Sequence, residues 1–345
     1  MPIINKRLFI WNLSFILIFI SGLSIRSNAQ NRLYPAEITV DKNGNGDYKT
    51  IQEAINSIRD LGEKEIKIFV KKGTYKEKVI IPSWKTKIHL IGESKESTII
   101  TFDDYSGKLI SSGKDAFGLD MFSTYTSYTF LVQANDIFLE NLTIANVSGR
   151  VGQAVALHVE GDRFVANNCN FLGNQDTLFA AGENSRQFYA NCFIEGTTDF
   201  IFGKATALFE NCTIKSLANS YITAAATSSN QKFGLVFISC RLIAAEGIDK
   251  VFLGRPWRPF AKTVFIASNL GNHIVAEGWN PWKGDAMFPD KEKTAFYAEY
   301  KNTGQGADAK NRVIWAKQLT GKEAKLYTIQ NILGGTDNWN PKKLK

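Results

Sequence analysis

The sequence predicts an all-β fold, a right-handed parallel β-helix, because a short strand-forming segment recurs along the chain and long helical periodicity is missing. Four cysteines mark the recurrence at intervals of 23, 20 and 28 residues: Cys169, Cys192, Cys212 and Cys240. The segments around them are rich in Val, Ile, Phe and Thr, which favour strands. Similar segments without cysteine occur at residues 140–144 and 265–270. Repetition at a nearly constant period is typical of a solenoid, whose coils stack about 4.8 Å apart.

One segment departs from this pattern and predicts a short helix that caps the N-terminal end of the β-helix. Residues 48–61 place Ile51, Ala54, Ile55 and Ile58 at helical spacing. This spacing puts four apolar side chains on one helix face. We expect that face to cover the first coil.

The first 29 residues have the pattern of a cleavable signal peptide. Two basic residues at positions 6 and 7 precede an apolar stretch at 8–23, and Ser-Asn-Ala follows at 27–29. An uncleaved membrane anchor is the alternative, but the apolar stretch is short for a span and is followed by a cleavage pattern. We therefore expect cleavage near Ala29, one domain at residues 30–345, and a secreted or periplasmic protein without a membrane anchor.

The charge of the chain narrows its partners only slightly. The net charge is +8, and removing residues 1–29, which hold three basic residues and no acidic one, leaves +5. A positive exported protein favours polyanions in general, so acidic polysaccharide, nucleic acid and anionic lipid all fit. Simple solubility explains the same charge equally well.

The cysteines occupy one position of the repeat and should form an inward-facing column. Small buried thiols pack there like other small apolar groups. Neighbouring coils also lie within disulfide reach, and an exported protein meets an oxidising environment. A disulfide between Cys192 and Cys212 is the pairing we expect if one forms.

Two aspartates occupy equivalent positions of this repeat. Asp176 lies in the stretch GNQDTLF and Asp199 in DFIFG, 23 residues later, each seven residues past a cysteine. Gln153 lies 23 residues before Asp176, and Arg255 lies 56 residues after Asp199, or two coils of 28. Solvated turn residues are the ordinary interpretation of such aspartates. The spacing instead predicts a column of polar groups on one face of adjacent coils.

Such a column is suited to acyl transfer without serine or histidine. Two stacked carboxylates do not both ionise easily, and an arginine beside one keeps that one anionic. The pair then provides an acid and a nucleophile at the same pH, while Gln153 and Gln175 can donate to an oxyanion. No Gly-x-Ser-x-Gly motif occurs, and no metal-ligand spacing involves the three histidines, His89, His158 and His273. We therefore expect neither a metal nor an organic cofactor, although a supporting role for His158 stays open.

Five short motifs occur in order along the chain, and together they resemble those of one enzyme family. They are GTYKE at 73–77, QAVAL at 153–157, GNQDTLF at 173–179, DFIFG at 199–203 and LGRPW at 253–257. With these motifs the chain resembles the pectin methylesterases (pectinesterases), carbohydrate esterase family eight, over roughly residues 38–342. No inhibitor-like pro-domain precedes the motifs, which makes the chain more similar to bacterial members than to plant preproproteins.

The resemblance implies hydrolysis of the methyl esters of polygalacturonate, with release of methanol. By motif match, Asp199 is the nucleophile and Asp176 the general acid and then base. Gln153 and Gln175 are the oxyanion donors, and Arg255 orients Asp199. Aromatic side chains line the substrate groove in this family, and the matching positions here are Phe202, Trp257 and, less closely, Trp282. The implied partner is methylated homogalacturonan, not nucleic acid, and the implied state is a monomer.

Three other classes of function remain open from the residues alone, and so does an esterase that acts on a different ester, because the groove aromatics do not identify the sugar. Polysaccharide lyases with this fold need Ca²⁺ and clustered acidic ligands, whereas Asp103-Asp104 is the only adjacent acidic pair. A glycoside hydrolase would use two carboxylates for acid and base chemistry. A non-catalytic β-helix would bind the polysaccharide and release nothing. Either depolymerase would shorten the polymer, and an esterase would not.

Overall fold

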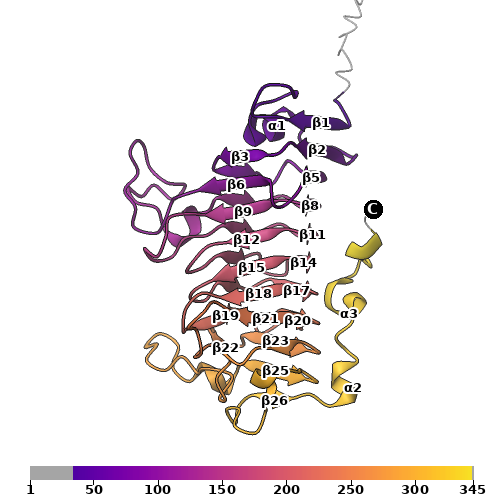
Figure 1. The fold of residues 1–345 in the computed structure, drawn as a ribbon. Helices are drawn as coiled ribbons and strands as arrows, with labels where there is room; N and C mark the ends of the chain where they lie inside the picture. The colour runs from indigo at the N-terminus through magenta and orange to yellow at the C-terminus, as the bar shows by residue number, and fades with distance from the viewer. Residues whose placement is uncertain (1–33, 344–345) are drawn as a thin grey trace, which may run out of the picture. The chain divides into compact units, whose positions relative to one another are not determined.

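The protein is built from parallel strands that repeat coil after coil, as the computed structural model of residues 34–343 shows (Figure 1). Every pairing between named strands is parallel, and each complete coil contributes one strand to each of three long sheets. The prediction of a parallel β-helix is confirmed. The signal peptide predicted at residues 1–29 lies outside the described residues.

The three sheets are named here by their strand numbers. The eleven-strand sheet contains β1 (Glu37–Val40), β2 (Ile66–Val70), β5 (Ile88–Gly92), β8 (Ile137–Glu140), β11 (Phe164–Asn167), β14 (Arg186–Ala190), β17 (Thr206–Glu210), β20 (Leu235–Ile238), β23 (Lys262–Ile266), β25 (Phe296–Tyr300) and β26 (Lys317–Gln318). The eight-strand sheet contains β3 (Gly73–Lys76), β6 (Thr98–Phe102), β9 (Thr143–Asn146), β12 (Asn170–Leu172), β15 (Phe193–Gly196), β18 (Thr213–Ser216), β21 (Arg241–Ala244) and β24 (Asn269–Leu270). The seven-strand sheet contains β4 (Val79–Ile81), β7 (Phe130–Val132), β10 (Leu157–Val159), β13 (Leu178–Ala180), β16 (Ile201–Gly203), β19 (Tyr221–Ala225) and β22 (Phe252–Pro256).

The recurring segment of the sequence is the turn from the eleven-strand sheet into the eight-strand sheet. Four of these turns carry asparagine with a positive φ of 51–55°: Asn141, Asn168, Asn191 and Asn211. Asparagine tolerates this left-handed backbone better than most residues do. The residue after each asparagine points inward, and it is leucine in the first turn and cysteine in the other three. The repeat is therefore set by a backbone requirement followed by a packing requirement.

The interior is filled by columns of like side chains that stack from coil to coil. Phe209, Phe237 and Phe265 lie face to face, with ring centroids 4.5 and 4.4 Å apart. Such stacked rings bury a large apolar area and add a specific contact. This column links β17, β20 and β23 through the interior.

The cysteine column is buried as predicted, but the predicted disulfide between Cys192 and Cys212 is wrong. All four cysteines are free thiols. Strands that pair in parallel and in register hold equivalent Cβ atoms about 4.8 Å apart, whereas a disulfide needs about 3.8 Å. Instead, the thiols of Cys192 and Cys212 donate to the carbonyls of Ala166 and Tyr189, at 3.5 and 3.4 Å.

The predicted capping helix is present at the N-terminal end but is shorter than the sequence pattern. Helix α1 (Ile51–Ser57) packs on β1 and β4 and buries Ile51, Ala54 and Ile55. The Thr50 hydroxyl accepts from the Glu53 amide at 3.2 Å, and the Glu77 carboxylate accepts from the Ile51 and Gln52 amides at 3.1 Å each. These caps satisfy the free amides of the first turn.

A segment after β26 folds back along the outer face of the eleven-strand sheet (Figure 1). It contains α2 (Gly321–Ala324), α3 (Ile329–Leu333) and the short 3-10 helix η4 (Pro341–Lys343). Ile332 and Leu333 pack on an apolar patch of that face formed by Val165, Phe188, Leu208 and Val236. No helix within residues 34–343 is long and apolar enough to cross a bilayer.

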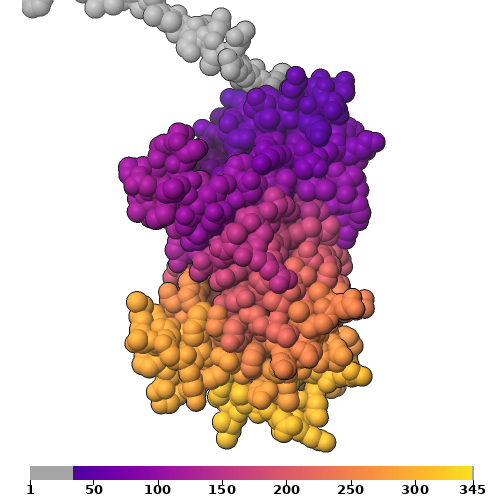
Figure 2. All heavy atoms as spheres, turned by 60° about the vertical axis from the view of Figure 1, so that its left-hand side comes forward, coloured from indigo at the N-terminus to yellow at the C-terminus, as the bar shows by residue number. Residues whose placement is uncertain are grey.

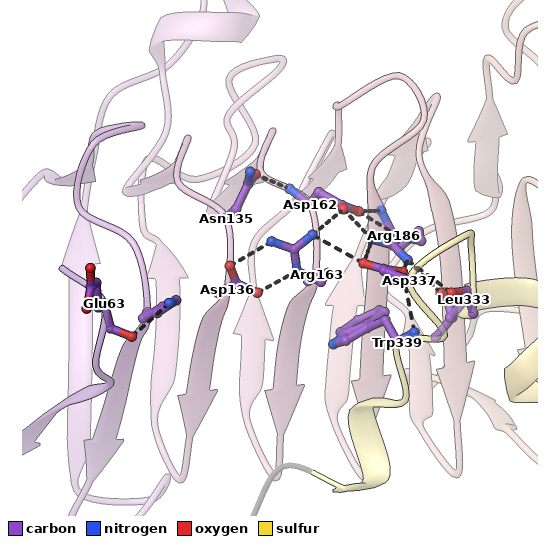
Figure 3. Close-up of polar contacts among 11 residues, drawn as sticks. Glu63, Asn135, Asp136, Asp162, Arg163, Arg186, Leu333, Asp337 and Trp339 are labelled. Carbon is purple, nitrogen blue, oxygen red and sulfur yellow. Dashed lines mark hydrogen bonds and ion pairs between the residues drawn. The ribbon is translucent and has the colours of Figure 1, made fainter. Parts of the chain in front are cut away.

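A network of ion pairs fastens this C-terminal segment to the sheet (Figure 3). The Arg186 guanidinium donates to Asp162 at 2.6 Å and to Asp337 at 2.9 Å, and also to the Leu333 carbonyl at 3.2 Å. Arg163 forms a forked pair with Asp136 and reaches Asp337 at 3.4 Å. The Arg186 guanidinium lowers the pKa of Asp337, so this contribution to stability is present at neutral pH and is lost as acid protonates Asp337.

Replacing Arg186 should release the C-terminal segment. Arg186→Ala leaves Asp162 and Asp337 with only the longer side-chain contacts from Arg163 and removes a donor to the Leu333 carbonyl, so we expect a loss of about 2 kcal/mol of unfolding free energy. Arg186→Lys retains the charge without the fork and should lose less. Urea unfolding and limited proteolysis of the segment after residue 320 measure both effects. Equal unfolding midpoints for wild type and Arg186→Ala would contradict this account.

Candidate active site

The two aspartates that the sequence singled out, Asp176 and Asp199, lie side by side just before the first residues of neighbouring strands in the seven-strand sheet. Asp176 precedes β13 and Asp199 precedes β16, and the strands pair with Leu178 opposite Ile201. Both aspartates have positive φ, 66° and 49°. The ladder of hydrogen bonds on either side imposes this uncommon backbone, including a bond from the Asp176 amide to the Thr198 carbonyl at 3.1 Å. The turn geometry directs both carboxyls to the same place.

Arg255 makes a forked ion pair with Asp199. Its Nε lies 3.0 Å from Oδ1 and its Nη2 lies 2.6 Å from Oδ2. The sequence predicted that Arg255 lies two coils after Asp199 and in register with it. Arg255 does lie two coils later, but the predicted register is wrong: Arg255 pairs with Ala224, and Ala224 pairs with Phe202. Arg255 is therefore equivalent to Phe202, three residues after Asp199, and its long side chain extends back to the Asp199 carboxylate.

Burial and charge separate the proton affinities of the two carboxyls. Asp176 and Asp199 are 8% and 6% exposed. Burial raises the pKa of Asp176 well above its ordinary value, and the neighbouring charge of Asp199 raises it further. Burial also raises the pKa of Asp199, but the forked bond to Arg255 opposes that rise. Of the two carboxyls, Asp176 therefore has the higher proton affinity and Asp199, beside Arg255, the lower one.

Two glutamine amides complete the polar floor of the site. Gln153 and Gln175 pair across an isolated parallel bridge, so Gln153 is in register with Gln175 and not, as predicted, with Asp176. Within the described residues, no protein group hydrogen-bonds to either side-chain amide. Both amides are available to donate to a ligand oxygen.

A cavity of about 340 Å³ gathers all of the residues that the sequence singled out for catalysis and substrate contact. Its lining includes Gln153, Gln175, Asp176, Asp199, Phe202, Arg255, Trp257 and Trp282. Phe202 stacks on Phe179 at 4.3 Å and meets Trp257 edge to face at 5.8 Å. The Trp282 ring covers the Arg255 guanidinium, 3.6 Å from its central carbon.

Sequence reasoning missed several residues of this cavity. Thr124, Tyr125 and Arg258 line it, and Tyr221 lies behind Arg255, its ring 4.0 Å from the guanidinium carbon. Thr124 and Tyr125 come from a long insertion between β6 and β7, which carries no repeat signal. Arg258 follows the LGRPW motif directly, and this proximity is the one signal that could have identified it.

A larger cavity of about 770 Å³ continues from the site and shares Tyr125, Trp257 and Arg258 with it. His158 lies in its wall, against the Phe179 ring at 4.5 Å and with Nε2 3.3 Å from a Glu160 oxygen. Figure 2 shows the hollow between two protruding loops, one purple and one orange. The two cavities together form a groove that is open along one side of the β-helix.

The fold and the site together define a β-helical carboxylic ester hydrolase. The site offers two buried carboxyls of different proton affinity, an arginine paired with one of them, and two amide donors in one groove. The model of the pectinesterase family matches residues 37–336. The chain belongs to the pectinesterase family.

Individual relatives agree with this assignment. A putative pectinesterase 11 from Arabidopsis thaliana is 39% identical over 88% of this chain and 81% of its own length. The pectin methylesterase from carrot is 32% identical with a TM-score of 0.78, over 87% of this chain and 93% of that one. Another solved pectin methylesterase, bound to a hexasaccharide, is 32% identical with a TM-score of 0.76, over 88% and 97%. The chain spans about half the length of other relatives, such as a probable pectinesterase/pectinesterase inhibitor from Brassica napus.

Removing the arginine should change the pH dependence of the site. Arg255→Ala takes away the forked partner of Asp199, so the pKa of Asp199 should rise. If Asp199 must be ionised for activity, the acid limb of kcat/KM moves to higher pH with it. Arg255→Lys should move it less. An unchanged acid limb in Arg255→Ala would mean that Arg255 serves only in packing.

Proposed function

We propose that this protein hydrolyses the methyl esters of polygalacturonate, the backbone of pectin, to free carboxylates and methanol. The observation that carries the proposal is the pair of buried carboxyls, of which Asp199 alone is held in a forked ion pair by Arg255 while burial and the charge of Asp199 raise the pKa of Asp176. Membership of the pectinesterase family supports this substrate, as does the hexasaccharide bound by a related pectin methylesterase.

In the first half of the proposed reaction, Asp199 attacks the carbonyl carbon of the methyl ester. The carbonyl oxygen becomes negative, and the amides of Gln153 and Gln175 donate to it. The bond to the methoxy group then breaks, and Asp176 gives its proton to the departing oxygen. Methanol leaves, and the galacturonate acyl group is joined to Asp199 as an anhydride.

In the second half, a water molecule hydrolyses the acyl-enzyme. Asp176, now a carboxylate, takes a proton from the water as its oxygen attacks the galacturonate carbonyl. The bond to Asp199 breaks, and the Asp199 carboxylate returns to its ion pair with Arg255. The proton remains on Asp176, so both carboxyls are restored to their starting states.

The groove around the site fits an acidic sugar polymer. Phe202 and Trp257 present aromatic surface at the cavity, which suits the apolar faces of sugar rings. Arg258 lines both cavities and presents a cation to the polymer, whereas Lys204 in the larger cavity is paired with Glu183 at 3.5 Å. Because the groove is open, a polymer can bind without an end entering a tunnel.

Substitution of the two aspartates tests the proposed chemistry. Asp199→Asn removes the nucleophile and should reduce methanol release from highly methylated pectin by about 10³-fold or more. Asp176→Asn removes the proton donor and should also lose most activity. Asp120→Asn, at a side chain that is 77% exposed, is the matched control and should match wild type.

The same assay separates an esterase from a depolymerase when polymer length is followed alongside methanol, with EDTA present. Wild type should release methanol without shortening the polymer. Shortening without methanol would contradict the proposal and identify a depolymerase. Near-normal methanol release by Asp199→Asn would remove Asp199 from its proposed role.

The protein is proposed to act as an exported monomer. The basic and apolar pattern of residues 1–29 supports a cleaved signal peptide, and the two carboxyls, both glutamines and Arg255 assemble within a single chain, so the proposed chemistry needs no second copy. Mature protein recovered from the periplasm or medium should begin near Gln30, as read by N-terminal sequencing. Retention of residues 1–29 in a membrane fraction would contradict this.

A further inference from the structure

Lys291 is a buried cation that the proposed chemistry does not use. It belongs to η2 (Lys291–Lys293), and none of its side chain is exposed. Its Nζ lies 2.6 Å from an Asp285 oxygen and 3.4 Å from the Trp257 carbonyl. Burying an ammonium group costs several kcal/mol unless it is well paired, so the site that holds it is built for it.

The segment that Lys291 closes carries Trp282, and we refer to residues 279–291 as the Trp282 loop. The loop starts at Trp279, which is fully buried and packs on Tyr297 at 4.7 Å. It ends at Lys291, whose Nζ lies 4.4 Å from the centre of the Trp282 ring. Trp282 has a positive φ of 55°, which is uncommon for a bulky residue and needs contacts to hold it.

Asp285 ties the middle of the Trp282 loop to Lys291 at the start of η2. One of its carboxylate oxygens accepts from the amides of Met287 and Phe288, at 3.1 and 3.3 Å, and the other pairs with Lys291. The turn that follows Trp282 is thereby tied to η2. The ion pair holds the second half of the loop, and the buried Trp279 holds its beginning.

The loop contacts the catalytic machinery through a short chain of packed groups. Lys291 lies against Trp282, Trp282 covers Arg255 at 3.6 Å, and Arg255 grips Asp199 with its fork. An indole over a guanidinium favours the cation and keeps water from its face. The position of Trp282 therefore affects how firmly Arg255 holds the carboxylate.

We propose that Lys291, paired with Asp285, is a positioning residue that holds Trp282 against Arg255 and so maintains the Arg255–Asp199 fork. This inference rests on the proposed function of the carboxylate pair. Lys291 itself does not contact the reacting atoms. Its charge also lowers the pKa of Asp199, as a smaller effect than the contact with Arg255.

Few ionisable groups face the two ends of this chain of contacts. Asp176, Arg255, Lys291 and the buried Tyr297 hydroxyl face Asp199. Asp285 faces Lys291, and Arg258, stacked on Trp257 and Phe288, is another cation at this end of the groove. Burial raises the pKa of the Tyr297 hydroxyl, which therefore stays protonated in the working range, so a change in the acid limb reports on the carboxyls.

The neighbouring pair Lys293–Asp290 provides a matched control. It lies in the same short helix and has a similar separation of 2.7 Å, but its side chains are 71% and 59% exposed. An exposed pair of this kind contributes little. Lys293→Met therefore removes the same charge from the same element without disturbing the Trp282 loop.

The test compares Lys291→Met, Asp285→Asn and Lys293→Met with wild type in methanol release from methylated pectin. We expect Lys291→Met to lower kcat by about 10- to 100-fold, because a small displacement of catalytic groups has an effect of this size. Its acid limb should move to higher pH by roughly 1 unit. Asp285→Asn should change both in the same direction but less, and Lys293→Met should change neither.

A second readout keeps the inference testable whatever the substrate is. Carboxyl NMR gives the pKa of Asp199 without substrate, and it should be higher in Lys291→Met than in wild type. If folded Lys291→Met and Asp285→Asn both keep the wild-type pKa and pH profile and lose only thermal stability, Lys291 is a structural residue and the inference is overturned. If wild type releases no methanol, the proposed function fails, and the NMR comparison alone decides the inference. If Lys291→Met does not fold, Asp285→Asn decides it by the same two readouts.

Discussion

The register of the parallel coils is the constraint on which the rest of this structure depends. Hydrogen bonds between successive coils place each residue over its equivalent in the next coil, so like side chains meet. In the interior this produces stacked columns of phenylalanine, cysteine and isoleucine that bury the core. Just before strands β13 and β16 of the seven-strand sheet, the same register brings Asp176 and Asp199 together. Two ionised carboxylates at this distance would repel each other.

The two carboxyls can lie close together because a positive charge balances only one of them, Asp199. Arg255 pairs with Asp199 through two hydrogen bonds, whereas burial and the charge of Asp199 raise the pKa of Asp176. Both aspartates have a left-handed backbone, which the ladder on either side enforces. The stable coils thus hold Asp176 and Asp199 in an arrangement that is unfavourable by itself. In the proposed reaction these two residues are the acid and the nucleophile.

The sequence predicted the features that depend on the repeat, such as the adjacency of Asp176 and Asp199. Its predictions of register were wrong where coils differ in length. The spacing of Asp176 and Asp199 is one true coil, so their adjacency followed directly. Arg255 and Gln153 were assigned to the right site but to the wrong register, because loops between sheets change the length of a coil without leaving a local signal. The disulfide prediction failed because stacking distance alone does not provide disulfide geometry. Lys291 could not be found at all, since its burial depends on how an irregular loop folds.

The location of the proton is the central claim of this account, and carboxyl NMR with labelled aspartate measures it most directly. We expect one protonated aspartate signal at about pH 6, far above the ordinary aspartate pKa. It should vanish in Asp176→Asn and persist in Asp199→Asn, where burial still raises the pKa of Asp176. A spectrum with every aspartate ionised at that pH, or a protonated signal that vanishes in Asp199→Asn and persists in Asp176→Asn, would contradict the assignment of acid and nucleophile.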